Sequence, residues 1–234
     1  MLVQTVSRTT TRSTAAAVVA RTPKDLSAAA LQSIGSVCQF GRNQTIFSDG
    51  DIATYSYKVV TGAVRLVKLM PDGRRHIAGF RLTGDLFGIE WTNEYNLSAE
   101  AVSDVTAVRY AQSHLERLGE ERADVRKQIT DRLRNDLHDA HEHLISLGCQ
   151  SAKERVASFL QLLARRIEAT EGVVVDLPMG RQDIADYLGV TIETVCRTLS
   201  DLKEAQVIQI PNRHQIVVVS ETKLDAAANA DCDA

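Results

Sequence analysis

Hydrophobic and polar residues alternate along the chain between about residues 35 and 111. The clearest stretch is YSYKVVTGAVRLVKLMPDGRRHIAGFRLTGDLFG, in which apolar side chains recur at alternate positions. Alternation of this kind is typical of strands with one buried face. Residues 61–62 (Thr-Gly) and 71–73 (Pro-Asp-Gly) are strong turn signals between such strands. The pattern therefore predicts several short antiparallel strands, arranged as a small barrel or jelly roll.

The spacing of hydrophobic residues changes to three, four or seven beyond residue 112. This spacing predicts one helix over residues 114–147, with Ser113 as its N-cap and Glu116 completing a capping box. Such a helix is about 50 Å long and outreaches a small domain. Its apolar stripe therefore predicts a two-fold dimer, whereas the alternative is that the stripe packs on its own barrel. The expected interface residues are Leu118, Val125, Ile129, Leu133, Leu137 and Leu144.

A second domain is predicted to begin near the end of this helix. Gly148 is expected to cap the long helix at its C-terminus. Ser151 and Glu154 have the spacing of a capping box, which predicts that another helix begins directly afterwards. The apolar residues that this helix is expected to bury are Val156, Phe159, Leu160, Leu163 and Ile167.

Residues 181–202, RQDIADYLGVTIETVCRTLSDL, have the pattern of two short helices joined by Gly189. Glycine adopts the positive φ of such a tight turn most easily, and the small Ala185 lets the two helices cross closely. The other apolar residues expected to face inward are Ile184, Leu188, Val190, Val195, Leu199 and Leu202. This is the layout of a helix-turn-helix, and a β-hairpin predicted at about 207–220 makes it a winged version.

The second helix of this pair carries an acid, a thiol and an arginine on its outward side. Glu193, Cys196 and Arg197 share that side because they follow the i, i+3, i+4 spacing. On a recognition helix this side enters the major groove, where glutamate accepts from cytosine N4 and arginine donates to guanine O6 and N7. The alternative is a solvent-exposed Glu–Arg ion pair. The residues expected to contact phosphate are Arg181, Gln182, Thr191 and Thr194.

Composition and charge narrow the class of protein. The 234 residues suit two modest domains, and the net charge of −3 means that DNA affinity must come from a local surface. No apolar run approaches the length of a membrane span. The cysteines at 38, 149, 196 and 232 lie far apart, which argues against a metal or iron–sulfur site and for a reduced, cytoplasmic chain. Residues 1–24 contain no acidic residue and are expected to form a disordered arm rather than a transit peptide.

The predicted barrel, long helix and winged helix-turn-helix together resemble the CRP/FNR superfamily of bacterial transcription regulators over about residues 35–220. RLTGDLFGIE looks like the end of that family's β-roll. The recognition helix is most similar to the FNR/FixK branch, whose Glu, Ser and Arg match Glu193, Cys196 and Arg197. The resemblance implies an α+β protein that is not an enzyme. It also implies a homodimer that binds double-stranded DNA at a TTGAT-N4-ATCAA-type palindrome and contacts RNA polymerase, as an activator.

The resemblance also implies how the chain is divided. The expected parts are a disordered arm at 1–24, a cyclic-nucleotide-binding-like β-roll at 25–112, a dimerisation helix at 113–147, a winged helix-turn-helix at 148–221 and a flexible tail at 222–234.

Three departures from the family pattern bear on the signal that controls the protein. Ile192 stands where cyclic-AMP-responsive members have an arginine, which favours contact with a thymine methyl group and a TTGAT site over TGTGA. Leu97 stands where nucleotide-binding members have a phosphate-binding arginine, although Ser98 matches. Cys38 stands alone before the barrel, which argues against the cysteine cluster of iron–sulfur members. We therefore expect no cofactor and no metal.

The resemblance then implies a FixK-like regulator that binds DNA without an effector and controls genes of microaerobic respiration, nitrogen fixation or denitrification. The alternative is a sensor in which a small molecule in the β-roll, a cyclic nucleotide or another effector, gates DNA binding. Cys196 adds a hypothesis of its own: oxidation of the thiol beside DNA would place negative charge against phosphate and silence binding. The alternative there is a thiol that takes the place of the family's serine without a redox role.

Overall fold

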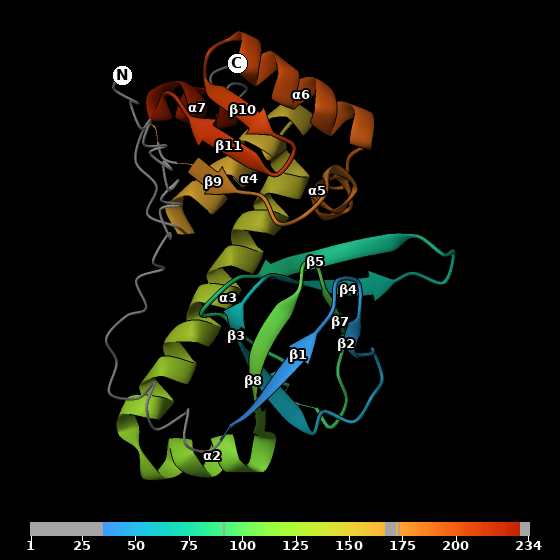
Figure 1. The fold of residues 1–234 in the computed structure, drawn as a ribbon, viewed down its shortest axis with the longest axis vertical. Coiled ribbons are helices and arrows are strands. Elements are labelled where there is room, and N and C mark those ends of the chain that lie inside the picture. Colours follow the sequence, from blue (N-terminus) through green and yellow to red (C-terminus); the bar gives the residue numbers. More distant parts are fainter. Residues whose placement is uncertain (1–34, 91, 167–171, 173, 230–234) are drawn as a thin grey trace, which may run out of the picture.

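The structure is a computed structural model that describes residues 35–90, 92–166, 172 and 174–229. It is an α+β protein, as expected, with a β-roll at one end, a long helix along its side and a helix-rich C-terminal domain at the other end (Figure 1). The expected arm at 1–24 and residues 25–34 lie outside the described residues. None of the helices in the described ranges is long and apolar enough to cross a membrane.

The β-roll consists of two four-stranded antiparallel sheets, as the alternating pattern predicted. Their strand orders are β1-β8-β3-β6 and β2-β7-β4-β5, so strands distant in sequence lie side by side as in a jelly roll. The strands are β1 (Ser36–Phe40), β2 (Thr45–Phe47), β3 (Tyr55–Thr61), β4 (Val64–Leu69), β5 (Arg75–Arg81), β6 (Leu86–Phe87), β7 (Ser98–Ala101) and β8 (Val105–Ala111). Aromatic rings pack in the interior, where the ring centroids of Phe47 and Tyr95 are 3.7 Å apart and those of Tyr57 and Phe87 are 5.2 Å apart.

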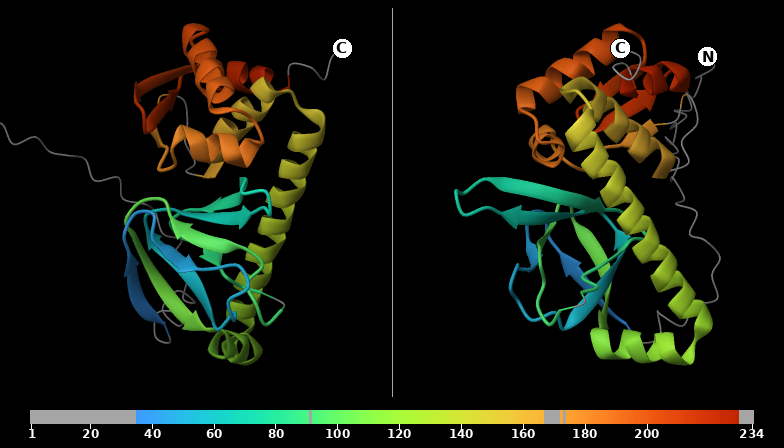
Figure 2. Two further views of the ribbon diagram at one scale, coloured as in Figure 1. Left: turned by 90° about the vertical axis from the view of Figure 1, so that its right-hand side faces the viewer. Right: turned by 180° about the vertical axis from the view of Figure 1, so that it is seen from behind.

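Two tight turns shape the hairpins of the roll where the sequence predicted them. Gly62, between β3 and β4, has a φ of 89°, and a Cβ there would lie 2.3 Å from the carbonyl oxygen of Asp104, so the turn requires glycine. Between β4 and β5 the Gly73 N–H donates to the Met70 carbonyl oxygen at 2.9 Å. The resulting β4–β5 hairpin runs directly beneath the C-terminal domain (Figures 1 and 2).

The single long helix expected over residues 114–147 is two helices, α2 (Gln112–Glu121) and α3 (Ala123–Cys149). Ala111 rather than Ser113 occupies the N-cap of α2, and Arg122 between the helices is extended, with φ −127° and ψ 108°. Leu115 and Val125 are ten positions apart, about 15 Å along a straight helix, yet both belong to one buried cluster with Tyr110. The bend therefore lets both helices bury their apolar sides on the roll.

The expected dimer stripe divides at about residue 130. Val125 is 0% exposed, and Leu118 and Ile129 pack against the same cluster, so this part of the stripe packs on its own roll. That corrects the expectation for Val125, whose side chain is not available to a second copy. Farther along α3, Leu137 is 58% exposed and Leu144 64% exposed, and Leu133 is half-buried.

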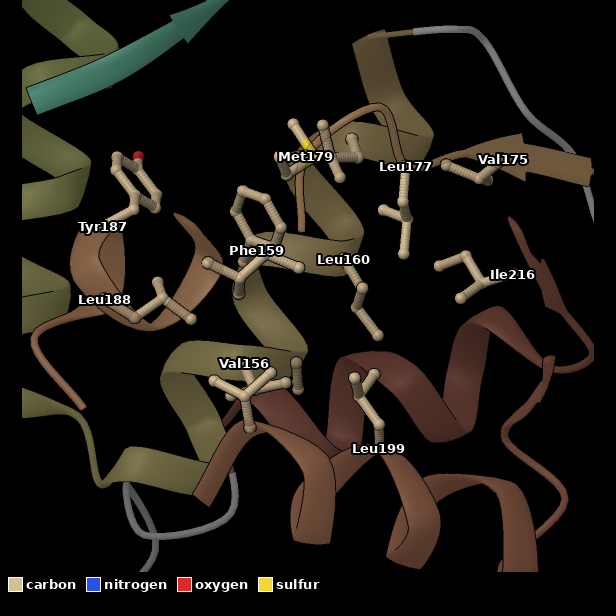
Figure 3. Packing of buried hydrophobic residues seen from close by; sticks show 14 of the residues in the cluster. Val156, Phe159, Leu160, Val175, Leu177, Met179, Tyr187, Leu188, Leu199 and Ile216 are labelled. Carbon is tan, nitrogen blue, oxygen red and sulfur yellow. The ribbon is translucent and has the colours of Figure 1, made fainter. Parts of the chain in front are cut away.

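The C-terminal domain packs helices against a three-stranded sheet of order β10-β11-β9. Its elements are α4 (Ala152–Arg166), β9 (Val174–Asp176), α5 (Arg181–Leu188), α6 (Ile192–Glu204), β10 (Ile208–Asn212), β11 (Gln215–Val218) and α7 (Glu221–Ala228). The predicted capping box of α4 is confirmed: the Ser151 N–H donates to Glu154 Oε2 at 2.7 Å, and the Glu154 N–H donates to Ser151 Oγ at 3.4 Å. Phe159 and Leu160 lie in the core that α4 forms with the other helices (Figure 3).

The other side chains expected inside α4 follow the same pattern. Val156 and Leu163 are also buried, whereas Ile167 lies outside the described residues. Gly148 does not cap α3, because the helix continues through Cys149 and ends at an extended Gln150.

The tail expected to be flexible from residue 222 instead forms α7. Ser220 caps this helix by accepting a hydrogen bond from the Lys223 N–H at 3.3 Å. Leu224 and Ala228 are buried in the core, where α7 packs beside α4. The alanine-rich composition is compatible with a helix, and the burial of one apolar side stabilises it. Residues 230–234 lie outside the described residues.

Candidate DNA-binding site

The turn between α5 and α6 has the geometry that a helix-turn-helix needs. Gly189 adopts the left-handed conformation, with φ 63° and ψ 36°, and the Val190 N–H donates to the Ala185 carbonyl oxygen at 3.1 Å. Ala185 and Val195 are completely buried where the two helices meet. The predicted turn and close crossing are therefore confirmed by the backbone.

Helix α6 begins with a threonine cap, as the sequence predicted. Thr191 Oγ1 accepts a hydrogen bond from the Thr194 N–H at 3.2 Å and lies 3.1 Å from Thr194 Oγ1. The two hydroxyl groups therefore contact each other at the N-terminus of α6. Thr191 is exposed and Thr194 is half-buried, and contact of either with phosphate stays a prediction.

The outward side of α6 presents the three polar residues that the spacing placed together. Glu193, Cys196 and Arg197 are all exposed, whereas Val195 and Leu199 on the opposite side are buried. Helix α6 lies at the end of the molecule away from the β-roll, with its outer side uncovered (Figures 1 and 2). This face of α6 is therefore free to enter a groove of DNA.

The charges on this face are separate rather than paired. The backbone N–H of Glu193 itself and the Thr191 hydroxyl donate to the Glu193 carboxylate and lower its pKa below the usual value. Within the described part of the chain, Arg197 has no ion-pair partner, so the Glu193–Arg197 pair weighed as the alternative does not form. A charged acceptor and a free guanidinium are the groups that base recognition requires.

Arg181 and Gln182, both predicted to contact phosphate, differ in exposure: Arg181 is half-buried, whereas Gln182 is exposed and hydrogen-bonded within α5. Burial lowers the pKa of Arg181, and its electrostatic interaction with Cys196 opposes that shift. Its Nη1 is buried without a hydrogen-bond partner among the described residues. The Gln182 side chain donates to Asp186 Oδ1 at 2.7 Å. The proximity of Arg181 to Cys196 has no sequence signal, because it depends on how α5 crosses α6.

Ile192 and the wing complete the surface around α6. Ile192 is half-buried and packs against the core, so only part of its side chain is open to a thymine methyl group. In the β10–β11 hairpin the Asn212 side chain donates to Gln215 Oε1 at 2.7 Å and leaves Arg213 exposed at the tip. Arg213 was not singled out from the sequence, although a basic residue in a wing loop was a signal for a phosphate contact.

The β-roll uses its possible ligand-binding residues for its own structure. The Ser98 hydroxyl accepts a hydrogen bond from the Asp49 N–H at 2.9 Å, and Leu97 packs against the aromatic core. Cys38 donates its S–H to the Ala107 carbonyl oxygen at 3.3 Å, and burial raises the pKa of its thiol. Across the described ranges, no group of three or more His, Cys, Asp or Glu side chains is arranged to hold a metal ion.

Two family models match the two ends of the chain. Residues 37–122 match the cyclic nucleotide-binding domain, and residues 154–227 match the Crp-like helix-turn-helix domain. The two matches correspond to the β-roll with α2 and to the domain that contains α5 and α6. The long helix α3 connects them.

Several curated proteins are similar to the chain over most of its length. The nitrogen fixation regulation protein FixK of Bradyrhizobium diazoefficiens is 43% identical over 179 residues, which cover 76% of both chains. The FixK protein of Azorhizobium caulinodans is 43% identical over 194 residues, which cover 82% of this chain and 78% of that protein. The transcriptional activatory protein AadR of Rhodopseudomonas palustris is 38% identical, with 82% and 81% covered.

Solved structures show the same architecture. The structure of FixK2 from Bradyrhizobium japonicum has a TM-score of 0.77 and 36% identity, and the match covers 83% of this chain and 97% of that one. A CooA mutant from Carboxydothermus hydrogenoformans has a TM-score of 0.72 at 18% identity, a similarity that concerns the fold alone. With the exposed face of α6, these similarities show that the chain belongs to the CRP/FNR family of DNA-binding transcription regulators, in its FixK group, and is not an enzyme.

Proposed function

We propose that the protein is a homodimeric transcription activator that binds a TTGAT-N4-ATCAA-type palindrome. The observation that carries the proposal is the exposed, unpaired set of Glu193, Cys196 and Arg197 on α6. The arginine supplies two donors for guanine, and the carboxylate supplies an acceptor for cytosine. The proposed phosphate contacts are Arg181 and Gln182 in the first turn of α5, Thr191 and Thr194 at the N-terminus of α6, and Arg213 in the β10–β11 hairpin.

The proposed dimer uses the C-terminal half of α3. Leu137, Leu144 and Ile145 are 57–64% exposed there, which is unusual for large apolar side chains on one helix. A second copy related by two-fold symmetry would cover this face and place two α6 helices side by side, which matches a palindromic site. RNA polymerase is the partner through which an activator of this family acts, and the cytoplasm of a bacterium is where both it and the DNA are found.

We further propose that the protein binds DNA without a small-molecule effector. The stacked rings of Phe47, Tyr57, Phe87 and Tyr95 pack the interior of the β-roll, and Ser98 is engaged by the Asp49 backbone. The second candidate is a regulator gated by a cyclic nucleotide or another effector. The match of residues 37–122 to the cyclic nucleotide-binding domain favours that candidate.

Similarity to FixK proteins supports a role in the control of nitrogen fixation genes, and we extend this to genes of microaerobic metabolism. FixK of Bradyrhizobium diazoefficiens and FixK of Azorhizobium caulinodans are both named as nitrogen fixation regulators.

Fluorescence anisotropy of the reduced protein without added ligand tests these proposals. The protein is titrated against a TTGAT-N4-ATCAA duplex and against a TGTGA…TCACA duplex that keeps the same separation between the TGA and TCA of its two half-sites. Tight, selective binding to the first duplex supports the effector-independent activator. Weak binding to both that is restored by a cyclic nucleotide would favour the gated sensor. Preference for TGTGA would contradict the role assigned to Ile192.

Cys196 carries a further proposal about how the activity is switched off. Its thiol is exposed with Glu193 and Arg197 on the outward side of α6, which we call the reading face, and it interacts with the charge of Arg181. Two equivalents of hydrogen peroxide convert the thiol to a sulfinic acid with release of two water molecules, and the sulfinate would repel phosphate. We expect peroxide to abolish binding of the wild-type protein and to leave Cys196→Ser unaffected. Equal loss of binding in both proteins would contradict the proposal.

A further inference from the structure

We propose that Arg65 and Arg75 of the β-roll are positioning residues for DNA binding. They hold α5, the first helix of the helix-turn-helix, in one orientation relative to the roll. This inference rests on the proposed function, because it concerns how two recognition helices in a dimer keep a fixed separation. Neither arginine lies on α6: Arg65 acts through Asp183 of α5, and Arg75 acts through Asp183 and Asp186.

Arg65 on β4 forms an ion pair with the DNA-binding domain that is almost fully buried. Its Nη1 lies 3.1 Å from Asp183 Oδ1, and its Nη2 lies 2.7 Å from Glu100 Oε2 of the neighbouring strand β7. The side chains of Arg65 and Asp183 are only 11% and 10% exposed. In such surroundings an unpaired charge is strongly unfavourable, so the pair constrains where α5 can lie.

Arg75 on β5 extends the same contact along α5. Its Nη2 lies 2.8 Å from Asp183 Oδ1, and its Nε donates to Asp186 Oδ2 at 2.8 Å. Asp183 also accepts a hydrogen bond from the Gly180 N–H at 3.3 Å, which caps the N-terminus of α5. One carboxylate therefore joins two strands of the roll to the first turn of the helix-turn-helix.

An apolar layer lies next to these ion pairs. The ring of Phe80 on β5 is 5.5 Å from the ring of Tyr187 on α5 and 6.1 Å from the ring of Phe159 on α4. Tyr187 also stacks on His143 of α3 at 4.0 Å. The roll and the DNA-binding domain thus share one core, beside which His143 of α3 stacks, and the ion pairs add the directional contacts that apolar packing lacks.

This docking orients the reading face and does not cover it. Glu193, Cys196 and Arg197 remain exposed, and α6 lies at the end of the molecule away from the roll (Figure 1). Because α5 and α6 meet at a tight turn and a close crossing, the orientation of α5 also determines that of α6. A rigid path therefore runs from α3, the proposed dimer helix, through the roll to the recognition helix.

A fixed separation of the two recognition helices affects the affinity only when both half-sites of a palindrome are bound at once. Once one recognition helix is bound, the second binds its half-site at an effective concentration set by how well its position is constrained. Loosening α5 lowers that effective concentration and weakens binding to the palindrome. Binding to a single half-site involves one recognition helix and does not depend on the separation.

The test compares Arg75→Glu with Arg74→Glu in the full-length protein. Arg74 is the neighbouring residue of the same hairpin, is 82% exposed and pairs with Asp72 in its own turn, so it controls for the change of charge. By anisotropy we expect Arg75→Glu to lose about tenfold affinity for the TTGAT-N4-ATCAA duplex and to match wild type on a duplex with one TTGAT half-site. Arg74→Glu should match wild type on both duplexes.

A charge exchange separates positioning from simple damage. The double variant Arg75→Glu/Asp186→Arg replaces the ion pair with its reverse and should restore most of the affinity for the palindrome. The proposal is overturned by wild-type palindrome affinity in Arg75→Glu, by an equal loss in Arg74→Glu, by an equal loss on the half-site, or by failure of the exchange to restore binding.

Hydrogen–deuterium exchange in the absence of DNA tests whether Arg75 holds α5, independently of the proposed function. Faster exchange of residues 181–188 in Arg75→Glu, and not in Arg74→Glu, is the expected result, because the roll no longer holds α5. If the exchange of residues 181–188 is unchanged in Arg75→Glu, Arg75 does not hold α5, and the inference is overturned even if the palindrome is bound. A wild-type protein that binds neither duplex would refute the proposed function, and the exchange data would still decide whether Arg75 holds α5.

Discussion

Helices α5 and α6 each carry charged side chains about one turn apart, and the surroundings of these charges differ completely. Asp183 and Asp186 of α5 are largely buried and pair with arginines of the β-roll. Glu193 and Arg197 of α6 are exposed and unpaired with each other. The comparison teaches that charge on a helix-turn-helix has two uses: on α5 it fixes the domain in place, and on α6 it is left free for DNA.

Removal of one acid from each helix is the strongest way to break this comparison. Asp183→Ala removes the buried carboxylate that pairs with both Arg65 and Arg75 and removes a helix cap, so we expect a loss of about 3 kcal/mol in the free energy of unfolding. Glu193→Ala should change it by no more than about 0.5 kcal/mol, because its surroundings are solvent. Urea denaturation measures both, and equal losses would show that the two acids have the same structural role.

Arg197→Ala tests the free charge on α6. Loss of a bidentate contact to guanine should weaken binding to the TTGAT duplex by about 10- to 100-fold. The free energy of unfolding should be unchanged. Lys203→Ala is the matched control, because Lys203 is an exposed cation in the last turn of the same helix. Anisotropy with both variants checks the prediction. A similar loss in the two variants would indicate general charge attraction rather than base recognition.

Gly189→Ala tests the turn between α5 and α6, and Gly148→Ala inside α3 is its control. Alanine at 189 must adopt a φ of about 63°, which should destabilise the protein by about 1 to 2 kcal/mol, although space for a Cβ is available. Gly148 lies inside α3 with nothing near its Cβ position, so alanine there should stabilise by up to about 1 kcal/mol. Thermal unfolding of the two variants should therefore shift in opposite directions.

His143 offers the smallest expected effect and tests the packing beside α5. Burial lowers the pKa of His143 below its usual value, and the charges of His76 and Arg155 act in the same direction. The folded protein then binds fewer protons than the unfolded chain, so its stability is full above about pH 6.5 and falls as the pH drops below that value. The Tm of the wild-type protein should decrease more between pH 7.5 and pH 5.5 than that of His143→Gln.

A second helix histidine provides the control for that measurement. His138 lies on the same helix and is exposed, so His138→Gln should show the wild-type decrease in Tm. If His143→Gln loses as much stability as wild type on acidification, groups other than His143 cause the decrease.

Local hydrogen bonds explain which features the sequence alone predicted. The capping box of Ser151 and Glu154 and the cap of Thr191 on α6 join residues three positions apart, so their spacing is enough to recognise them. The same holds for the turn at Gly189 and for the shared face of Glu193, Cys196 and Arg197, which follow from helix geometry. The sequence by itself therefore determined the helix-turn-helix and its reading face.

Contacts between distant residues decided the rest, and they leave no local pattern. The break at Arg122 arises because Leu115 and Val125 bury on one roll, and α7 forms because Leu224 finds a place beside α4. Arg65 and Asp183 are 118 residues apart, so only the folded chain brings them together. Hydrophobic burial and ion pairing depend on which surfaces meet, and that is a property of the tertiary structure rather than of sequence spacing.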